Sequence, residues 1–316
     1  MYPHNTSFSP DNPTLQLYWD STSYKAFKTC PFKYYLQNVC GYVPKRRSVH
    51  LAFGIAFHAA VEEYHRLCAK HIPHEEAVFL VLRAAYYRQL RTQAEKIAGH
   101  GHHEYSVPDD EKSAKTPKTL LRTILWYLDQ FTETNDPAQT HILANGEPAV
   151  ELSFSIPLDN GFFYSGHFDR IVEFNSHLWV TDYKTTTASL NAHYFGQWTP
   201  DIQMTGYTIA SKIVFETPAK GILVDAARIG VTFTEFARQP INRTASQLDE
   251  FLSDLTLDLT IAKVYAENES WPMNPESCGN YGGCVFRKVC SHPPSVRENF
   301  LQADFTKRIW DPRKER

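Results

Sequence analysis

The sequence has no long hydrophobic run, and no stretch of its 316 residues approaches the roughly 18 consecutive apolar residues that a membrane-spanning helix requires. Its first residues also lack the basic start and the apolar segment of a secretory signal. We therefore expect a protein that is not secreted and has no membrane partner. The expected location is cytoplasmic, or the host cytoplasm if the source is a virus, and this compartment is reducing.

An excess of positive charge is also lacking, because 35 acidic residues balance 32 lysines and arginines. This balance excludes a chain coated with positive charge, such as a histone, but it does not exclude a local basic groove. Apolar residues make up 42% of the chain and aromatic residues 14%, which excludes an intrinsically disordered protein. The chain is long enough for a large hydrophobic core.

Cysteines are few, and in a reducing compartment six of them indicate thiols or metal ligands rather than disulfides. Cys278, Cys284 and Cys290 are separated by five residues each, in a glycine-rich context. Three regularly spaced cysteines indicate a metal site that needs a fourth ligand. Cys30, which precedes a proline, is the candidate, and Cys40 is its main competitor. We interpret Cys40 and Cys68 as buried thiols.

The pattern of apolar residues predicts an α/β fold with helices packed around a central sheet. We expect a loose arm at 1–20, a helical region at 21–147, a core at 148–267, and a cysteine-bearing lobe with a basic tail at 268–316. Predicted helices cover 21–34, 53–70, 75–98, 119–134, 197–215 and 245–266. Predicted strands cover 149–156, 162–174, 178–185 and 222–233, with a hairpin turn at Asn160 and Gly161.

Two aspartates and a lysine lie on neighbouring predicted strands. Asp169 belongs to the sequence Gly-His-Phe-Asp-Arg-Ile, and Asp182 and Lys184 belong to Val-Thr-Asp-Tyr-Lys-Thr. Because side chains alternate along a strand, Asp182 and Lys184 emerge on one face, and a short turn places Asp169 beside them. Converging carboxylates repel each other unless a cation lies between them, and Mg²⁺ or Mn²⁺ prefers such oxygen ligands. The ammonium can hold a water or a phosphate oxygen.

The same residues have an ordinary interpretation, as an aspartate at a turn and an Asp–Lys pair on a solvated face. Leu178 and Val180 share the face of Asp182 and Lys184, so this face is not plainly exposed to solvent. The second acidic strand directly upstream also favours a functional site.

These two segments resemble the PD-(D/E)XK nucleases, and specifically the RecB-like branch that includes CRISPR-associated and phage exonucleases. The resemblance covers the chain in pieces from about residue 21 to residue 290. It implies a restriction-endonuclease-like core, in which a small mixed central sheet is flanked by helices. It also implies a divalent metal ion and a DNA substrate.

The resemblance assigns roles to further residues. His58, within Gly-Ile-Ala-Phe-His, matches a metal-ligand histidine of the family, and the Tyr183 carbonyl matches a further ligand beside Asp169 and Asp182. Gln203 and Tyr207 match the family pattern Q-x-x-x-Y, which is associated with positioning DNA or the catalytic lysine. Glu62 and His65 follow His58 on the predicted helix, either as part of the site or as an ordinary polar edge.

The resemblance also implies a 4Fe–4S cluster held by Cys30, Cys278, Cys284 and Cys290, which would join both chain ends into one composite unit. The C-x5-C-x5-C spacing departs from the C-x2-C-x5-C spacing of many such relatives. A zinc site at the same four cysteines, or thiols without a metal, therefore stay open.

The predicted function is a Mg²⁺- or Mn²⁺-dependent deoxyribonuclease. The relatives imply an exonuclease that acts on DNA ends, single-stranded ends included, in recombination, repair or DNA processing, with a helicase or recombination protein as a further partner. Asp169, Asp182 and Lys184 would perform catalysis with Gln203 and Tyr207. The alternatives are a DNA-binding accessory subunit that does not cleave, and a redox iron–sulfur protein that would leave the acidic strands unexplained.

Overall fold

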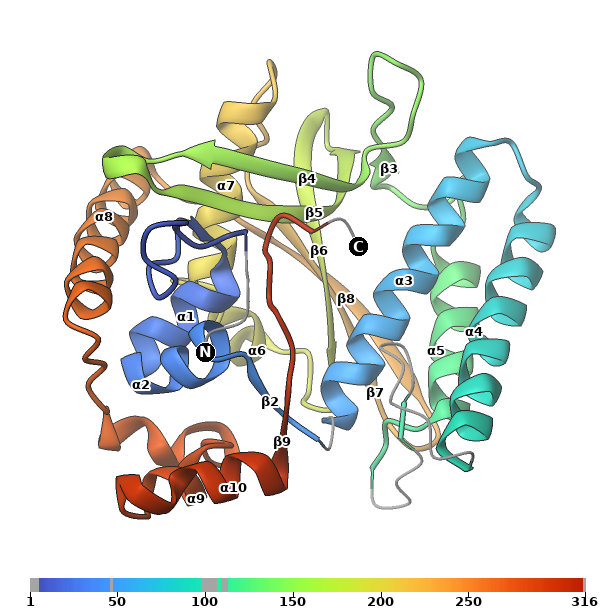
Figure 1. The fold of residues 1–316 in the computed structure, drawn as a ribbon. Coiled ribbons are helices and arrows are strands. Elements are labelled where there is room, and N and C mark those ends of the chain that lie inside the picture. The colour runs from blue at the N-terminus through green and yellow to red at the C-terminus, as the bar shows by residue number, and fades with distance from the viewer. Residues whose placement is uncertain (1–5, 46–47, 98–106, 109–112, 315–316) are drawn as a thin grey trace. The chain divides into compact units, whose positions relative to one another are not determined.

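The computed structural model of the chain describes residues 6–45, 48–97, 107–108 and 113–314 (Figure 1). Contacts divide the chain into two compact units, each assembled from segments that are distant in sequence. Unit 1 comprises residues 1–46, 153–166 and 244–316, and unit 2 comprises residues 47–152 and 167–243.

These units differ from the four consecutive segments expected from the sequence. Strands β4 (Val150–Pro157) and β5 (Phe163–Phe174) each begin in one unit and end in the other, so the chain crosses between the units within single strands. Both ends of the chain contribute to unit 1.

Unit 2 is built on a small mixed sheet. Its strands are β3 (Gln139–Thr140), the second part of β5, β6 (His177–Thr186), β7 (Ile222–Ile229) and β8 (Thr234–Ile241). The β3–β5, β5–β6 and β7–β8 pairs are antiparallel, and β6 and β7 are parallel. The parallel pair is joined through helices α6 (Ala192–Gly196) and α7 (Ile202–Val214), because parallel strands require a crossover connection.

Helices cover this sheet, which confirms the expected mixed sheet flanked by helices. Helix α3 (Val49–Ala69) packs against β6, and α5 (Pro117–Gln130) packs against β7 and β8, while α4 (His74–Ile97) packs on α3 and α5. Helix α7 packs against β6 and β7. No helix in the described part of the chain is long and apolar enough to cross a membrane.

The core of unit 2 explains why α3 and α5 lie where they do. Phe57 of α3 and Tyr127 of α5 are almost fully buried, and both rings meet the ring of Tyr183 on β6 edge-on. Helix α5 begins at a capping box in which Thr116 and Thr119 satisfy each other's backbone N–H groups, with Pro117 in the first turn. Tyr183 therefore points into the core, and its strand neighbours Asp182 and Lys184 point to the other face of β6.

Unit 1 combines residues from both chain ends. Its N-terminal elements are β1 (Tyr18–Trp19), α1 (Ser21–Thr29), α2 (Pro31–Tyr34), the π-helical turn Tyr35–Val39 and β2 (Tyr42–Pro44). Its later elements are the 3₁₀ turn Asp159–Gly161, α8 (Ala245–Glu267), the 3₁₀ segments Pro275–Gly282 and Pro294–Val296, α9 (Arg287–Cys290), α10 (Arg297–Asp304) and β9 (Phe305–Lys307). Strands β2 and β9 pair antiparallel, so backbone hydrogen bonds join the two ends.

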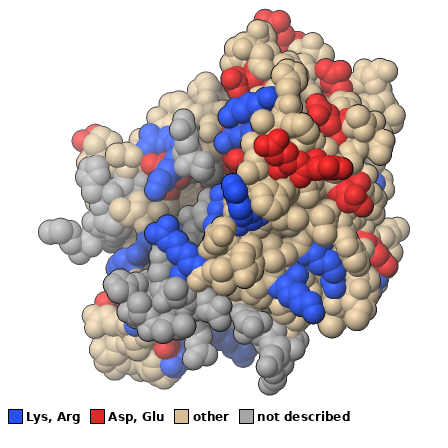
Figure 2. Space-filling view, turned by 90° about the vertical axis from the view of Figure 1, so that its right-hand side faces the viewer, with Lys and Arg blue, Asp and Glu red and all other residues tan. Residues whose placement is uncertain are grey.

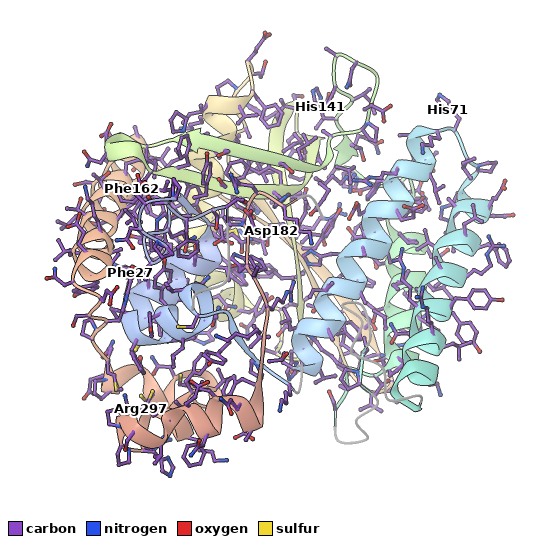
Figure 3. The ribbon with its side chains drawn as sticks, in the orientation of Figure 1. Phe27, His71, His141, Phe162, Asp182 and Arg297 are labelled. Carbon is purple, nitrogen blue, oxygen red and sulfur yellow. The ribbon has the colours of Figure 1, made fainter. Side chains whose placement is uncertain are left out.

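The arm expected at 1–20 is packed where the structure describes it, at residues 6–20. Trp19 is fully buried, stacks on Tyr34 with ring centroids 5.0 Å apart, and meets Phe27 (labelled in Figure 3) edge-on. The Trp19 indole N–H donates to the Gln16 carbonyl at 2.9 Å. The three prolines had suggested a loose segment, but burial of the aromatic Trp19 outweighs their effect. Residues 1–5 lie outside the described residues.

Three predicted elements have different bounds in the structure. The helix expected at 21–34 breaks at Cys30, because Pro31 disfavours helical backbone in the residue before it. The helix expected at 197–215 is present only from Ile202, as α7, because the Asp201 side chain caps it there, and the separate short helix α6 ends before the predicted range begins. The strand expected at 222–233 ends at Ile229, and a hairpin leads into β8, which was not predicted.

Candidate catalytic site

The pairing of β5 with β6 brings the two predicted aspartates together. Arg170 pairs with Thr181, so the next residues, Asp169 and Asp182, lie at the same level of the two strands. Both residues are buried, and Asp182 is only 1% exposed (labelled in Figure 3). Two acidic side chains therefore share a site largely withdrawn from water, as the sequence predicted.

Asp169 is held by contacts from α3 and β6. Its Oδ2 lies 3.3 Å from Nδ1 of His58 and accepts the Tyr183 backbone N–H at 2.9 Å. Burial alone would raise the pKa of Asp169, but the His58 imidazole and the Tyr183 N–H lower it to about 2. Burial alone would lower the pKa of His58, but pairing with Asp169 raises it above its usual value. The carboxylate of Asp169 is therefore ionised and suited to holding a cation.

Asp182 is in a less favourable environment for a charge. Burial raises the pKa of Asp182 to about 6; the Lys184 ammonium opposes this rise, and the nearby Asp169 carboxylate adds to it. The Lys184 ammonium forms an ion pair with Asp182 Oδ2, yet this buried oxygen has no partner with hydrogen-bond geometry. Ionisation of Asp182 is therefore costly beside a second buried carboxylate, and a divalent cation between the two would offset this cost.

Lys184 is fixed from three sides on the same face of β6. Besides the Asp182 carboxylate, its ammonium donates to Oε1 of Gln203 on α7 at 3.0 Å and lies 5.2 Å from the ring centroid of Trp198. Gln203 thus contacts the predicted lysine directly. The contact between Lys184 and Trp198 was not predicted from the sequence. It depends on the path of the connection between α6 and α7, and no spacing of residues in the sequence indicates it.

The other predicted residues lie nearby with different contacts. Tyr207 is 6% exposed and packs edge-on against Phe168, so it belongs to the core beneath the site. Glu62 pairs with Arg66 at 2.9 Å, although the Asp169 charge contributes to its raised pKa after the larger effect of burial. His65 is buried, and burial holds its pKa well below the usual value, so it is a neutral core residue.

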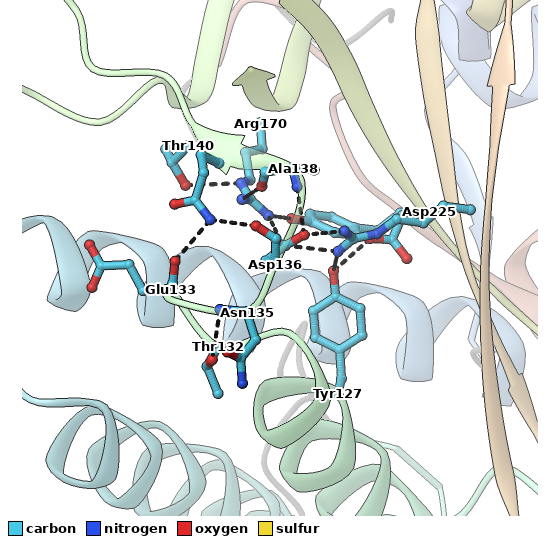
Figure 4. A network of polar contacts seen from close by, with 12 residues as sticks. Tyr127, Thr132, Glu133, Asn135, Asp136, Ala138, Thr140, Arg170 and Asp225 are labelled. Carbon is cyan, nitrogen blue, oxygen red and sulfur yellow. Dashed lines mark hydrogen bonds and ion pairs between the residues drawn. The ribbon is translucent and has the colours of Figure 1, made fainter. Parts of the chain in front are cut away.

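A buried network of charged side chains links β5 to β7 and β8 (Figure 4). Arg238 of β8 bonds to Asp225 of β7, with Nε and Oδ2 2.7 Å apart, and also to both carboxylate oxygens of Asp136. Arg170, next to Asp169, reaches Asp136 and the Tyr183 hydroxyl, each at 3.4 Å. Sequence reasoning missed this network, because its members come from five separate segments. The only indication of the network in the sequence was Arg170, a charged residue directly after Asp169 in a predicted strand.

The four predicted cluster cysteines belong to unit 1. Cys30 ends α1, and its sulfur accepts the Asn274 backbone N–H at 3.3 Å, while the Cys284 N–H donates to the Cys278 carbonyl at 3.0 Å. All six cysteines are free thiols. Burial raises the pKa of Cys290 to about 11, and the charges of Cys284, Cys30 and Cys278 contribute to it. Cys290 therefore lies within electrostatic range of the other three cysteines.

Cys40 and Cys68, expected to be buried thiols, are both buried, and burial raises the pKa of each. Among the described residues, no group of three or more histidine, cysteine, aspartate or glutamate side chains has the arrangement of a formed metal site. The buried carboxylates and the cysteines are candidate ligands by their chemistry alone.

Comparison with known proteins gives a family and a fold. The family model of the PD-(D/E)XK nuclease superfamily matches residues 20–291. No curated protein matches the chain significantly. A crystal structure named "Putative exonuclease", from Eubacterium rectale, is 14% identical with a TM-score of 0.51, over 90% of this chain and 92% of that one. At this identity the likeness shows a shared fold, in agreement with the mixed sheet of unit 2.

A second solved structure, SSO0001, is similar only in part. It is 17% identical with a TM-score of 0.25, over 45% of this chain and 61% of that one.

Proposed function

This chain belongs to the PD-(D/E)XK nuclease superfamily, and we propose that it is a Mg²⁺- or Mn²⁺-dependent deoxyribonuclease that hydrolyses phosphodiester bonds in DNA. One observation carries the proposal. Asp169 and Asp182 lie side by side on paired strands, and the Lys184 ammonium is fixed against the second carboxylate. A protein that only binds DNA has no need for two buried carboxylates beside a lysine, because they would repel the phosphates.

The residues around these carboxylates fit a divalent ion. His58, Asp169, Asp182 and the Tyr183 carbonyl would hold it, and a mixture of carboxylate oxygen, carbonyl oxygen and imidazole suits Mg²⁺ or Mn²⁺. The position of Asp169 and Asp182 at the same level of paired strands supports this assignment. When bound, the ion would supply positive charge at the scissile phosphate and lower the pKa of a bound water.

Lys184 would orient the attacking water and stabilise negative charge on the phosphate in the transition state. Gln203 accepts a hydrogen bond from the Lys184 ammonium and so keeps it in one direction. Tyr207 would support the helix that carries Gln203 through its contact with Phe168. The catalytic residues of the proposal are therefore Asp169, Asp182 and Lys184, with Gln203 and Tyr207 as positioning residues.

We also propose the finer assignments that the motifs imply. The chain would belong to the RecB-like branch and act as an exonuclease on DNA ends, single-stranded ends included, in recombination, repair or DNA processing. A helicase or recombination protein would supply such ends as a partner. The six free cysteines fit a reducing compartment, which supports a cytoplasmic location.

The test is a digestion time course on linear and circular DNA with Mg²⁺, Mn²⁺ or EDTA. Asp182→Ala and Lys184→Met should each abolish cleavage of linear DNA, and an exonuclease should leave the circles intact. Glu173→Gln, which changes an exposed acid further along β5, should cleave like the wild type. Full activity of a clean Asp182→Ala preparation would refute the catalytic assignment.

The second candidate is an accessory subunit that binds DNA without cutting it. Metal-dependent shortening of labelled DNA separates the two functions. Retention of DNA on a gel, with no shortening in either metal, would favour the accessory role.

We further propose a 4Fe–4S cluster at Cys30, Cys278, Cys284 and Cys290, with a structural role. The electrostatic influence of Cys30, Cys278 and Cys284 on Cys290 in unit 1 supports it, as does the Asn274 N–H directed at the Cys30 sulfur. Backbone N–H groups that donate to sulfur stabilise such clusters. Bound Zn²⁺ is the alternative.

Anaerobically purified protein should contain iron and acid-labile sulfide in equal amounts and absorb visible light. Cys290→Ser should lose both metal and colour, whereas Cys68→Ser, in unit 2, should keep them. Zinc in place of iron would support the alternative, and full-length protein without any metal would overturn both.

A further inference from the structure

Helix α4 presents a stripe of large side chains to solvent. Phe79, Tyr86, Tyr87 and Leu90 are exposed by 60%, 49%, 61% and 40%, whereas the smaller side chains of Ala77, Val81 and Ala85 on the same helix are buried. Leu125 and Trp126 of the adjacent helix α5 are also exposed. We call these six residues the aromatic platform. Exposed apolar surface of this extent on a folded protein usually marks a binding site.

Basic residues lie on the same helices as the platform. Arg83, Arg88 and Arg91 lie on the same segment of α4, and Lys118 and Arg122 lie on α5. Neither residues 77–91 nor residues 117–128 contain an aspartate or glutamate. Figure 2, which views the side where α4 and α5 lie in Figure 1, shows basic side chains spread among uncharged ones, with most acidic side chains gathered near the top. The charge therefore suits a polyanion.

Rings and guanidinium groups alternate on the platform. Arg83 lies over the Phe79 ring, 5.4 Å from its centroid, and the rings of Tyr86 and Tyr87 are 6.0 Å apart. From Phe79 to Leu90 the stripe spans about 16 Å of helix at 1.5 Å per residue. A shallow groove of about 580 Å³ runs beside it, lined mainly by Phe79, Leu82, Tyr86, Leu121 and Leu125.

The α5 side of the platform is rigid. Arg122 donates to the carbonyls of Gly230, Val231 and Phe233 on the β7–β8 hairpin and lies over Trp126, 5.3 Å from the centroid of its ring. Its guanidinium is thus engaged within the protein and braces the helix. A fixed aromatic surface loses little conformational entropy when a ligand stacks on it.

We propose that the aromatic platform binds single-stranded DNA at a distance from the catalytic site. The proposal rests on the proposed nuclease function and names the substrate that this function handles. Bases would stack on Tyr86, Tyr87 and Phe79, and Arg83 would contact the phosphates between them. In a duplex the base faces are already stacked on one another, so a duplex could contact the platform only through its phosphates. Alternating rings and basic groups without acidic residues favour DNA over a protein partner, which is the alternative occupant.

The test measures binding by the full chain in EDTA, where cleavage is absent, using fluorescence anisotropy. The probes are a labelled 30-nucleotide thymidine strand, an abasic strand of equal length, and a duplex. The wild type should bind the thymidine strand at least about 10-fold more tightly than the abasic strand, since each stacked base contributes about 1–3 kcal/mol.

Tyr86→Ala/Tyr87→Ala should weaken binding of the thymidine strand about 10- to 100-fold, with little change for the abasic strand. Arg83→Gln should reduce the slope of log K against log[salt] by about 0.7.

The matched control is Leu257→Ala/Val264→Ala, which removes two apolar side chains of similar exposure from α8 in unit 1 and should bind like the wild type. Cleavage of a six-nucleotide strand should persist in the tyrosine variant, which shows an intact catalytic site. Unchanged affinity of the tyrosine variant for the thymidine strand would overturn the proposal and leave the platform to a protein partner. A wild type that binds as expected but cuts nothing would overturn the nuclease function alone.

Discussion

At the scale of single residues, the proposed catalysis depends on the position of the Lys184 ammonium group. Lys184 has a carboxylate, an amide oxygen and an aromatic face around it, and each removes freedom from a flexible side chain. Orientation of a catalytic group in advance lowers the entropy that the reaction must otherwise lose. Contacts to the ammonium should therefore affect turnover more than substrate binding.

Gln203→Met, which keeps the shape of the side chain but removes the acceptor, should lower kcat about 10-fold or more and leave KM nearly unchanged. The lost hydrogen bond involves a charged group, and such bonds contribute about 1.5–3 kcal/mol. Gln203→Glu should retain most activity, because a carboxylate also accepts from the ammonium. Steady-state kinetics on linear DNA with Mn²⁺ measures both; equal losses in the two variants would contradict a positioning role.

Lys115 makes stability depend on pH. Its ammonium is buried, donates to the carbonyl and hydroxyl of Thr185 at 2.8 and 2.9 Å, and burial lowers its pKa to about 8 from 10.5. Between these two values the unfolded chain binds more protons than the folded one, so stability rises with pH. The cost of burying the charge is present below pH 8 and disappears as the pH approaches 10.5.

Lys115→Met should therefore be most stabilised relative to the wild type near pH 7, and this advantage should shrink by on the order of 3 kcal/mol towards pH 10.5. Urea unfolding of both proteins across this range measures the difference, in which other titrating groups cancel. If the unfolding free energies of the two proteins changed equally with pH, the proposed effect of burying the Lys115 ammonium would be contradicted.

At the scale of elements, helix α5 illustrates how a local signal fixes a boundary. Thr116 accepts the Thr119 N–H, and the Thr119 hydroxyl accepts the Thr116 N–H. Thr116→Ala should cost about 1 kcal/mol of unfolding free energy, whereas Thr116→Ser should keep the cap. Denaturant unfolding compares the three proteins, and equal stability of all three would show that the cap contributes nothing.

The buried network joins elements that the sequence keeps apart, and Arg238 is its centre. Arg238→Met should cost about 3–5 kcal/mol, because it leaves the Asp136 and Asp225 carboxylates buried with one arginine fewer. Arg228→Met is the matched control. Arg228 pairs with Glu235 on the same two strands, but that pair is partly exposed and should contribute less than about 1 kcal/mol. Equal losses, measured by urea unfolding, would contradict the importance of burial.

Elements with strong local signals could be predicted from the sequence, and those fixed by tertiary contacts could not. Strands β4, β5 and β6 lie within about two residues of their predicted ranges, because alternation and the Asn160 turn define them. Strand β8 was not predicted; it contains Pro240, which an edge strand tolerates. Helix α3 begins at Val49, before its predicted start, because no capping side chain marks the boundary.

The same division applies to the site. Asp169, Asp182 and Lys184 followed from strand alternation, which places side chains without knowledge of the fold. Trp198 and the Asp136–Arg170–Arg238–Asp225 network needed the three-dimensional arrangement, since nothing in the sequence links residues separated by up to a hundred positions.

At the scale of the whole molecule, unit 1 depends on both chain ends together. Phe305 near the C-terminus stacks on Phe286 at 4.8 Å and meets Tyr42 edge-on, and its strand β9 pairs with β2. Phe305→Ala should cost about 3–5 kcal/mol. Hydrogen exchange should accelerate at residues 36–44 and 286–307 together, while β6 and β7 keep their protection. Acceleration confined to the C-terminal residues would contradict a shared core.

The division of unit 1 between the two chain ends also determines the order in which the protein matures during synthesis. All residues of unit 2 have been added once residue 243 is in place, whereas residues 1–46 must wait for residues 244–316. At about 5–20 residues per second, translation of residues 47–243 takes on the order of 10–40 s. During this interval Phe27 and Tyr34 lack Tyr265 and Trp271, which their rings contact in the folded protein. The unit that holds the paired carboxylates is complete in sequence before the unit that holds Cys30, Cys278, Cys284 and Cys290.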